Sequence, residues 1–299
     1  MSAKIDVSAW MNFPNNRDNR VLEGILKRSN KNYGKAFSAD SDVIYWSAES
    51  LGLDRVKAYR DAAPEIQKKI LADCSYALLR EAFAIERAGM AFASKMVLLS
   101  DDLESRILYS QFAAQEAAHY QAIAAYIPEE PSDLASDPFL SVLKDAIEQG
   151  DRMTLTLIIQ VFLEGWGLLH YKKLQKDCLN PGLADEFRQI LQDEAHHHGS
   201  GIALLNLDNL TEDQKNHGLG ILKTLLSMVA AGPWNVATIL QKHLLGGGQS
   251  PTVFFAELGH EVETPQKLQQ LKRILQVGGA QSFVDQLDSE NFFQLSIAQ

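Results

Sequence analysis

Residues 64–100 constrain the fold more than any other part of the chain, because they contain no proline after Pro64 and a single glycine. Their apolar residues recur with helical spacing, and the alternation typical of a strand is almost absent. As one helix the stretch would be about 55 Å long. Its second half is apolar on almost every face, as in a helix buried among other helices. The sequence therefore predicts an all-α fold.

Three further long helices are expected at about 102–126, 151–178 and 183–206, and with residues 64–100 they form a predicted four-helix core. The helix at 102–126 is expected to start at Asp101, because Glu104 three residues later gives the spacing of a capping box. Shorter helices are expected at about 20–29, 53–61, 138–150, 233–245, 252–260, 265–277 and 281–288, and another begins at Thr211 with Gln214. We predict a single domain with an N-terminal arm (1–62), a core (63–206) and a C-terminal helical extension (207–299) packed on the core.

Charge and cysteine content exclude several classes of function. The 299 residues include 28 basic and 38 acidic side chains, a formal charge of −10 that disfavours nucleic acids and anionic membranes as partners. Two cysteines, Cys74 and Cys178, cannot staple a chain of this length. The N-terminal residues lack a secretory pattern, and no stretch approaches the ~18 apolar residues of a membrane span. We expect a cytoplasmic protein that does not span a membrane.

Two Glu-x-x-His motifs lie in the predicted core helices, at Glu116–His119 and at Glu194–His197. Positions i and i+3 share a helix face, so each carboxylate and imidazole can bind one metal ion. Each motif follows another glutamate by 30 residues, Glu86 in the first case and Glu164 in the second.

The spacing indicates an internal repeat of two helix pairs, each of them an antiparallel hairpin. With a turn near residue 101, Glu86 and Glu116 lie at one level, whereas the rival Glu81 would miss that level by about 7 Å.

The chain contains three Glu-x-x-His motifs, and one such motif could arise by chance more readily than three. With 18 glutamates and 8 histidines, fewer than one Glu-x-x-His is expected. The third copy, Glu257–His260, has Ser227 where the repeat requires a glutamate and is interpreted as accidental. A single buried glutamate is more often ion-paired than metal-bound, but four carboxylates inside a bundle are very costly as bare charges. Two divalent cations would balance them.

Six residues are therefore predicted to bind two metal ions: Glu86, Glu116, His119, Glu164, Glu194 and His197. Ligands of this kind, without thiolate, suit iron or manganese better than zinc or copper. The arrangement resembles that of ferritin-like di-iron and di-manganese proteins. The segment Asp193–Gly199, DEAHHHG, also resembles the Asp-Glu-Ala-x-His signature of ribonucleotide reductase small subunits and related oxidases. The resemblance covers about residues 64–206.

This resemblance implies a ferritin-like four-helix bundle and an O2-dependent non-haem di-iron oxidase or oxygenase. In such families the reduced iron pair forms a peroxo species with O2 and oxidises an organic substrate by hydroxylation, desaturation or a related reaction. Two iron ions are expected, with manganese or a mixed pair as alternatives. Electrons would come from a ferredoxin or a flavin reductase, because the chain has no motif for such a cofactor. A ferroxidase, a manganese catalase and a helical scaffold with structural metals remain alternatives.

The resemblance also assigns two outer hydrogen bonds, from His119 to Asp193 and from His197 to Gln115. Ordinary polar helix positions are the alternative for both. A reductase subunit would carry its radical tyrosine where this chain has Ile123, and Tyr120 points elsewhere. The chain is also longer than a storage ferritin, and the additional segments are expected to build a small-molecule pocket or a homodimer interface. Apolar residues suggest such a pocket, although most are more often plain core: Phe83, Met90, Phe112, Ile123, Phe162 and Trp166.

Glycines inside the third and fourth core helices have two explanations. Gly165 and Gly167 each cost about 1 kcal/mol relative to alanine in a helix. They mark either a local bulge with open space beside the metals or close helix packing against Trp166. Gly199 and Gly201 allow the same two explanations. We expect His196 and His198 to lie at the edge of the bundle, and His170 to be structural.

Overall fold

The structure is a computed structural model that describes residues 20–29, 37, 39–40, 42–131, 134, 137–208, 210–245 and 248–295. These residues are mostly helical. Within them no strand forms, and the β-type pairing is an isolated antiparallel bridge between Trp46 and Cys178. The prediction of an all-α protein is confirmed.

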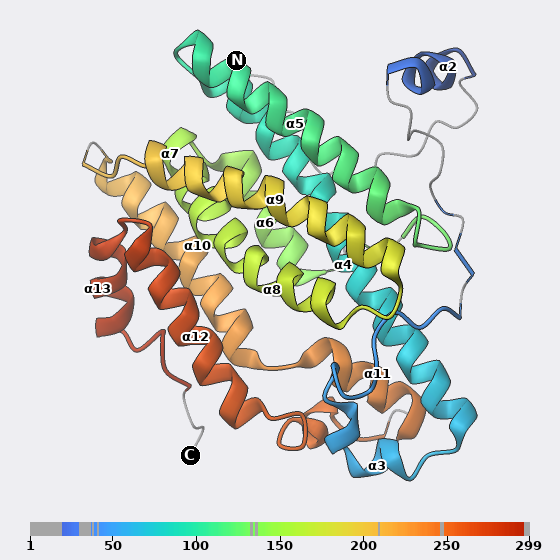
Figure 1. Ribbon diagram of the computed structural model, residues 1–299. Helices are drawn as coiled ribbons and strands as arrows, with labels where there is room; N and C mark the ends of the chain where they lie inside the picture. The colour runs from blue at the N-terminus through green and yellow to red at the C-terminus, as the bar shows by residue number, and fades with distance from the viewer. Residues whose placement is uncertain are drawn as a thin grey trace. The chain divides into compact units, whose positions relative to one another are not determined.

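Figure 1 labels the α-helices. In chain order the helical elements are α2 (Arg20–Ser29), η1 (Leu53–Arg55), α3 (Lys57–Arg60), α4 (Pro64–Leu99), α5 (Leu103–Ala124), α6 (Pro138–Gln149), α7 (Arg152–Leu155), η3 (Thr156–Leu163), α8 (Glu164–Asp177), α9 (Pro181–Leu204), α10 (Glu212–Ala231), α11 (Trp234–Leu244), η4 (Pro251–Phe254), α12 (His260–Val277) and α13 (Gln281–Ser289). The four predicted long helices are α4, α5, the run α7–η3–α8, and α9.

Helix starts agree with capping chemistry in most places. The carboxylate of Asp102 accepts the Ser105 N–H at 2.7 Å and caps α5, so the prediction that Asp101 begins this helix is wrong by one residue. Asp102 is the residue with extended backbone, which aims its side chain at the first turn. Thr211 and Gln214 form the predicted capping box of α10.

One C-terminal helix begins earlier than predicted. The structure has a short 3₁₀ turn, η4, and further turns where a helix at 252–260 was expected. Helix α12 starts at His260 instead of residue 265, directly after Gly259, whose φ of 79° lies in the left-handed region. Pro265 therefore lies inside the helix. Proline has no N–H, so the Glu261 carbonyl receives no i→i−4 hydrogen bond from this position.

The run Arg152–Asp177 contains a π-helix, η3, which ends immediately before Glu164. A local bulge is one of the two explanations for Gly165 and Gly167. The π-helix η3 is a bulge of this kind, and it lies on the N-terminal side of both glycines. By length and composition this run could cross a membrane, but 61% of its apolar window is buried, and core helices of soluble proteins meet the same criterion. The expectation of no membrane span stays a prediction.

The chain divides into two compact units, one comprising residues 1–41 and 78–152 and the other residues 42–77 and 153–299. These boundaries fall inside α4 and at the start of α7, whereas the predicted segments meet at 62/63 and 206/207. The single-domain arrangement stays a prediction.

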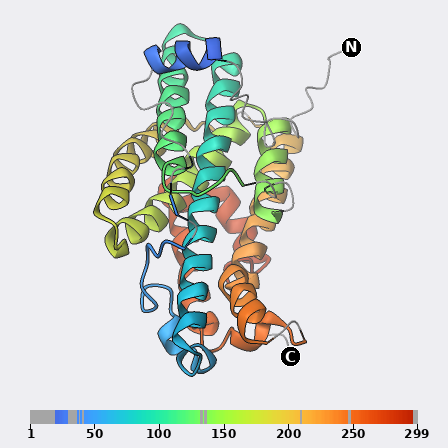
Figure 2. The same ribbon diagram turned by 90° about the vertical axis from the view of Figure 1, so that its right-hand side faces the viewer.

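The first unit is built on an antiparallel hairpin of α4 and α5, which lie side by side in Figures 1 and 2. Ring contacts run in opposite directions along the two helices: Phe92 lies 6.2 Å from Tyr109, and Phe83 lies 4.6 Å from Tyr120. The Lys95 ammonium donates to three carbonyls at the end of α6, those of Ile147, Glu148 and Gly150. A cation at this position complements the helix dipole.

The second unit contains a similar antiparallel pair, formed by η3 and α8 with α9. The Tyr171 and Phe187 rings lie 5.5 Å apart, and nearer the other end the Gln160 amide donates to the His197 carbonyl at 3.2 Å. A separate apolar cluster joins the N-terminal part of α4 to α3, α11 and η4. Its buried members are Leu53, Val56, Tyr59, Ile70, Cys74, Ala237, Leu240, Phe254 and Leu258.

Asp73 provides a test of the packing of α4 against α11 beside this apolar cluster. Its carboxylate accepts from Lys242 and His243 of α11, each at 2.8 Å. Burial raises the pKa of Asp73, but these two partners outweigh it and lower the pKa. We expect Asp73→Asn to reduce the free energy of unfolding at pH 7 by about 1 kcal/mol, as for a partly exposed pair. Because the pKa of Asp73 is lower in the folded state than its ordinary value of 3.8, the ionised carboxylate stabilises the fold above pH 3.8. This stabilisation is lost as the pH falls through the folded-state pKa.

Urea denaturation at neutral and acidic pH measures this effect. The difference between wild type and Asp73→Asn should be present at neutral pH and be lost as the pH falls below the ordinary pKa of 3.8 and through the lower folded-state pKa. Asp54→Asn is the control, because Asp54 is exposed and has no ion pair among the described residues. Equal losses in both variants would contradict the role of Asp73.

Candidate metal centre

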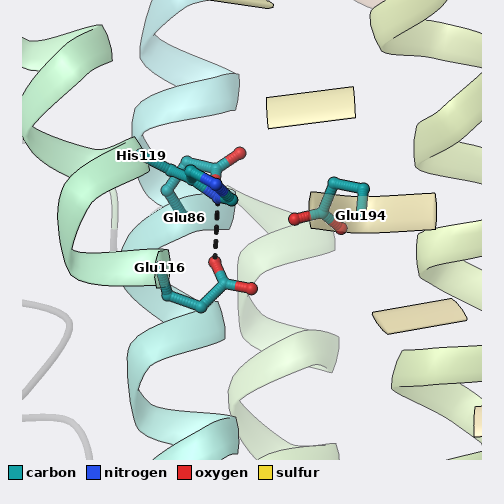
Figure 3. A group of neighbouring side chains, drawn as sticks. All are labelled: Glu86, Glu116, His119 and Glu194. Carbon is teal, nitrogen blue, oxygen red and sulfur yellow. Dashed lines mark hydrogen bonds and ion pairs between the residues drawn. The ribbon is translucent and has the colours of Figure 1, made fainter. Parts of the chain in front are cut away.

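Three of the predicted ligands gather in the first unit. Glu86 of α4 and Glu116 and His119 of α5 are 1%, 5% and 5% exposed. One ligand atom of each lies within 4.8 Å of the others. His119 Nδ1 is 3.1 Å from Glu86 Oε2 and 4.0 Å from Glu116 Oε2 (Figure 3). We call this group the first triad.

The hairpin explains how the first triad forms. Glu116 and His119 are one turn apart on the buried face of α5, with Phe112 and Ile123. Because α4 runs antiparallel, Glu86 is brought level with them, as the spacing from the turn predicts.

Gly89 makes room for the first triad, a role that the sequence reasoning missed. A Cβ atom at this position would lie 2.3 Å from Glu116 Oε2 and 2.5 Å from its Cδ. The Glu116 carboxylate therefore rests against a helix surface that has no side chain there. The signal was present in the sequence, because Gly89 is the single glycine in the stretch 64–100.

The other three predicted ligands gather in the second unit. Glu164 begins α8, and Glu194 and His197 lie one turn apart on α9; they are 9%, 6% and 1% exposed. One ligand atom of each again lies within 4.8 Å of the others, and His197 Nδ1 is 3.5 Å from Glu194 Oε1. We call this group the second triad. Glu194 is also drawn in Figure 3.

The electrostatics of the second triad favour a bound cation. Burial lowers the pKa of His197, but the carboxylates of Glu194, Glu164 and Asp193 outweigh it and raise the pKa. The imidazole thus lies in a negative potential strong enough to reverse the effect of burial. The same potential attracts a metal ion.

Both triads fit a divalent metal by their donors. Each offers two carboxylates and one imidazole, so a divalent ion balances the charge of each triad when the imidazole is neutral. Ligand atoms about 2.1 Å from a common ion lie within about 4.2 Å of each other, so a spacing of 4.8 Å needs only small side-chain rotations. The structure thus supports a buried Glu/His group that could bind metal. The union of both triads in one centre stays a prediction.

Other candidates are placed outside the triads. Glu81 is half-buried, and burial together with the charge of Asp137 raises its pKa to about 7. His196 is exposed. Burial and the charges of Lys173 and Lys267 lower the pKa of His170 to about 4 and keep its imidazole neutral, in agreement with a structural role.

The third Glu-x-x-His motif has a structural explanation. A Glu257 carboxylate oxygen accepts the Lys57 backbone N–H at the start of α3, and His260 Nδ1 contacts the Thr264 hydroxyl at 2.8 Å. Both side chains have local partners unrelated to a metal, which supports the interpretation that this copy is accidental.

The glycine pairs are explained by close packing at one member of each. A Cβ at Gly165 would lie 2.7 Å from His198 Cε1, and a Cβ at Gly201 would lie 2.5 Å from Gln160 Cβ. Gly167 and Gly199 meet nothing within 4 Å. The packing partners are thus His198 and Gln160, and Trp166 is not among the nearest atoms.

The predicted outer bonds of Asp193 and Gln115 and the apolar pocket stay predictions. Phe83, Phe112, Ile123 and Phe162 are buried, and Met90 and Trp166 are partly buried. Ring packing of Phe83 on Tyr120 and of Phe112 on Tyr109 supports the core role for these two phenylalanines.

Comparison with protein-family models, curated proteins and solved structures finds no match for this chain.

Gly89→Ala tests the packing of the first triad. Alanine should favour the helix itself by about 1 kcal/mol, but its methyl group must displace the Glu116 carboxylate. We expect at least a tenfold loss of Co(II) affinity at one of two sites, without loss of thermal stability in the metal-free protein. Isothermal titration with Co(II) and thermal unfolding measure the two effects. Gly167→Ala is the matched control, since its methyl group meets nothing; equal Co(II) binding by both variants would contradict the role of Gly89.

Proposed function

We propose that this protein is an O2-dependent non-haem di-iron oxidase or oxygenase that acts on a small, apolar organic substrate. The observation that supports it best is the pair of buried Glu-Glu-His triads, each assembled from two antiparallel helices. Carboxylate-rich ligation with one imidazole per ion is typical of oxygen-activating iron sites in helical bundles.

The proposal joins the two triads into a single dimetal centre of a ferritin-like bundle. The ground for this step is the sequence repeat, in which Glu86 precedes Glu116 by the same 30 residues that separate Glu164 from Glu194. In such a centre the four carboxylates and two imidazoles would hold two divalent ions, and no net charge would remain to be buried.

The protein's own residues have three tasks in this proposal. The carboxylates and imidazoles fix the positions of the ions. Buried side chains around Glu86 and His197 exclude water. The additional helices supply the substrate pocket. Iron, when bound, supplies the redox chemistry with O2, and a ferredoxin or flavin reductase supplies the electrons.

Anaerobic loading with Fe(II), followed by mixing with O2, tests the proposal. We expect two iron ions per chain by elemental analysis and rapid O2 uptake with a transient visible absorption. Glu116→Ala and His197→Ala should each retain only the ion of the intact triad. Glu81→Gln is the control, because Glu81 is a half-buried glutamate on α4 that lies outside both triads. This variant should retain both ions.

The other outcomes distinguish the alternatives. Absence of bound iron, or iron content that neither alanine variant changes, would overturn the proposal. Bound iron without O2 uptake would indicate a scaffold with structural metals. Oxidation of excess Fe(II) would indicate a ferroxidase, and peroxide disproportionation by the manganese-loaded protein would indicate a catalase.

A further inference from the structure

We propose that His198 is a positioning residue of the metal site, which holds the π-helix η3 through the Gln160 carbonyl and thereby places Glu164. This inference rests on the proposed metal site, but it concerns residues that bind no ion themselves. His198 is half-buried on α9, next to the ligand His197.

The backbone of η3 changes which N–H group faces the Gln160 carbonyl, and His198 of α9 contacts this oxygen. In a regular α-helix this oxygen would accept the Glu164 N–H, four residues later. The Glu164 N–H instead bonds to the Ile159 carbonyl, five residues earlier. His198 Nδ1 lies 2.8 Å from the Gln160 oxygen, and since a carbonyl can only accept, the imidazole donates its Nδ1–H.

The Gln160 side chain adds a second connection to the same turn of α9. Its amide donates to the His197 carbonyl at 3.2 Å and to the Ser200 hydroxyl at 3.3 Å. The Ser200 hydroxyl in turn donates to the His197 carbonyl at 2.8 Å. Gln160 is fully buried and is the one amide side chain in the apolar run TLIIQVFL, so an unpaired amide here would be costly.

Two glycines permit this close approach. Gly201 lies against Gln160, with 2.5 Å between its would-be Cβ and the Gln160 Cβ, and 3.3 Å to the Gln160 carbonyl carbon. Gly165 lies against the His198 ring, at 2.7 Å from Cε1. Both glycines are buried. Each makes its helix less stable than alanine would, so the close contact between the two helices is formed in spite of a low helix propensity at these positions.

The consequence concerns the direction of Glu164. Each residue of a helix turns it by about 100°, so conversion of the π segment to regular α-helix would rotate Glu164 away from Glu194 and His197 by up to that angle. The π form is rare, and a hydrogen bond from a neighbouring helix to one of its carbonyls favours it. His198 supplies that bond from the helix that also carries the ligands.

Co(II) binding by the full-length protein tests the inference. In His198→Leu the donor is absent, and we expect about a tenfold loss of affinity for one of two Co(II) ions, with a change in its visible absorption bands. In His198→Asn the side-chain amide can donate from nearly the position of Nδ1, and both affinity and spectrum should be retained. His196→Leu is the matched control on the exposed side of α9.

A second pair of variants keeps the test decisive if His198→Leu does not fold. Gly201→Ala pushes against Gln160 and should reproduce the loss, whereas Gly199→Ala meets nothing within 4 Å and should bind as wild type does. Unchanged Co(II) affinity and spectrum in His198→Leu would overturn the inference, as would equal binding by the two glycine variants. Loss in both His198→Leu and His198→Asn would indicate direct ligation by His198 and would also overturn it. A wild-type protein that binds no Co(II) would overturn the metal site itself.

Discussion

The burial of two carboxylates within each triad is the constraint on which the rest of the structure depends. Glu86 and Glu116 in the first unit, and Glu164 and Glu194 in the second, are almost fully removed from water. An isolated buried carboxylate is far too costly to persist in the charged form. One protonated imidazole per triad would reduce the charge from two to one, whereas a divalent ion beside a neutral imidazole reduces it to zero. A divalent ion bound by a triad would therefore stabilise it, and metal binding and folding would then be coupled.

Features that weaken the helices are found where they relieve this constraint. Gly89 interrupts an otherwise strong helix and leaves room for the Glu116 carboxylate. Gly165 and Gly201 allow His198 and Gln160 to meet, and η3 replaces α-helical bonds just before Glu164. Each departure costs stability on its own. Their concentration at the ligands, within helices that are otherwise regular, favours a role in the site over incidental strain.

The sequence predicts the local parts of this arrangement well. Helices α2 and α4 follow from periodicity and punctuation, and the grouping of the candidate ligands into two triads follows from helix-face geometry and the repeat of 30 residues. What it could not predict depends on partners distant in the chain. The Gln160 carbonyl of the π-helix is contacted by His198 of α9, which is 38 residues away in the chain. The early start of α12 depends on the left-handed backbone of Gly259, and periodicity contains no information about either.

The two triads share a sequence pattern but differ in internal geometry. Gly89 and Gly167 are equivalent in the repeat, each three residues after the first glutamate, yet Gly89 contacts a ligand carboxylate and Gly167 contacts nothing within 4 Å. His119 Nδ1 lies 3.1 Å from Glu86 Oε2 of the opposite helix and 4.0 Å from Glu116 Oε2 of its own helix, and His197 Nδ1 lies 3.5 Å from Glu194 Oε1 of its own helix. The difference coincides with η3, which has no counterpart in the regular α-helix before Glu86. Two ions held by unequal triads would differ in ligand strength and in available coordination positions.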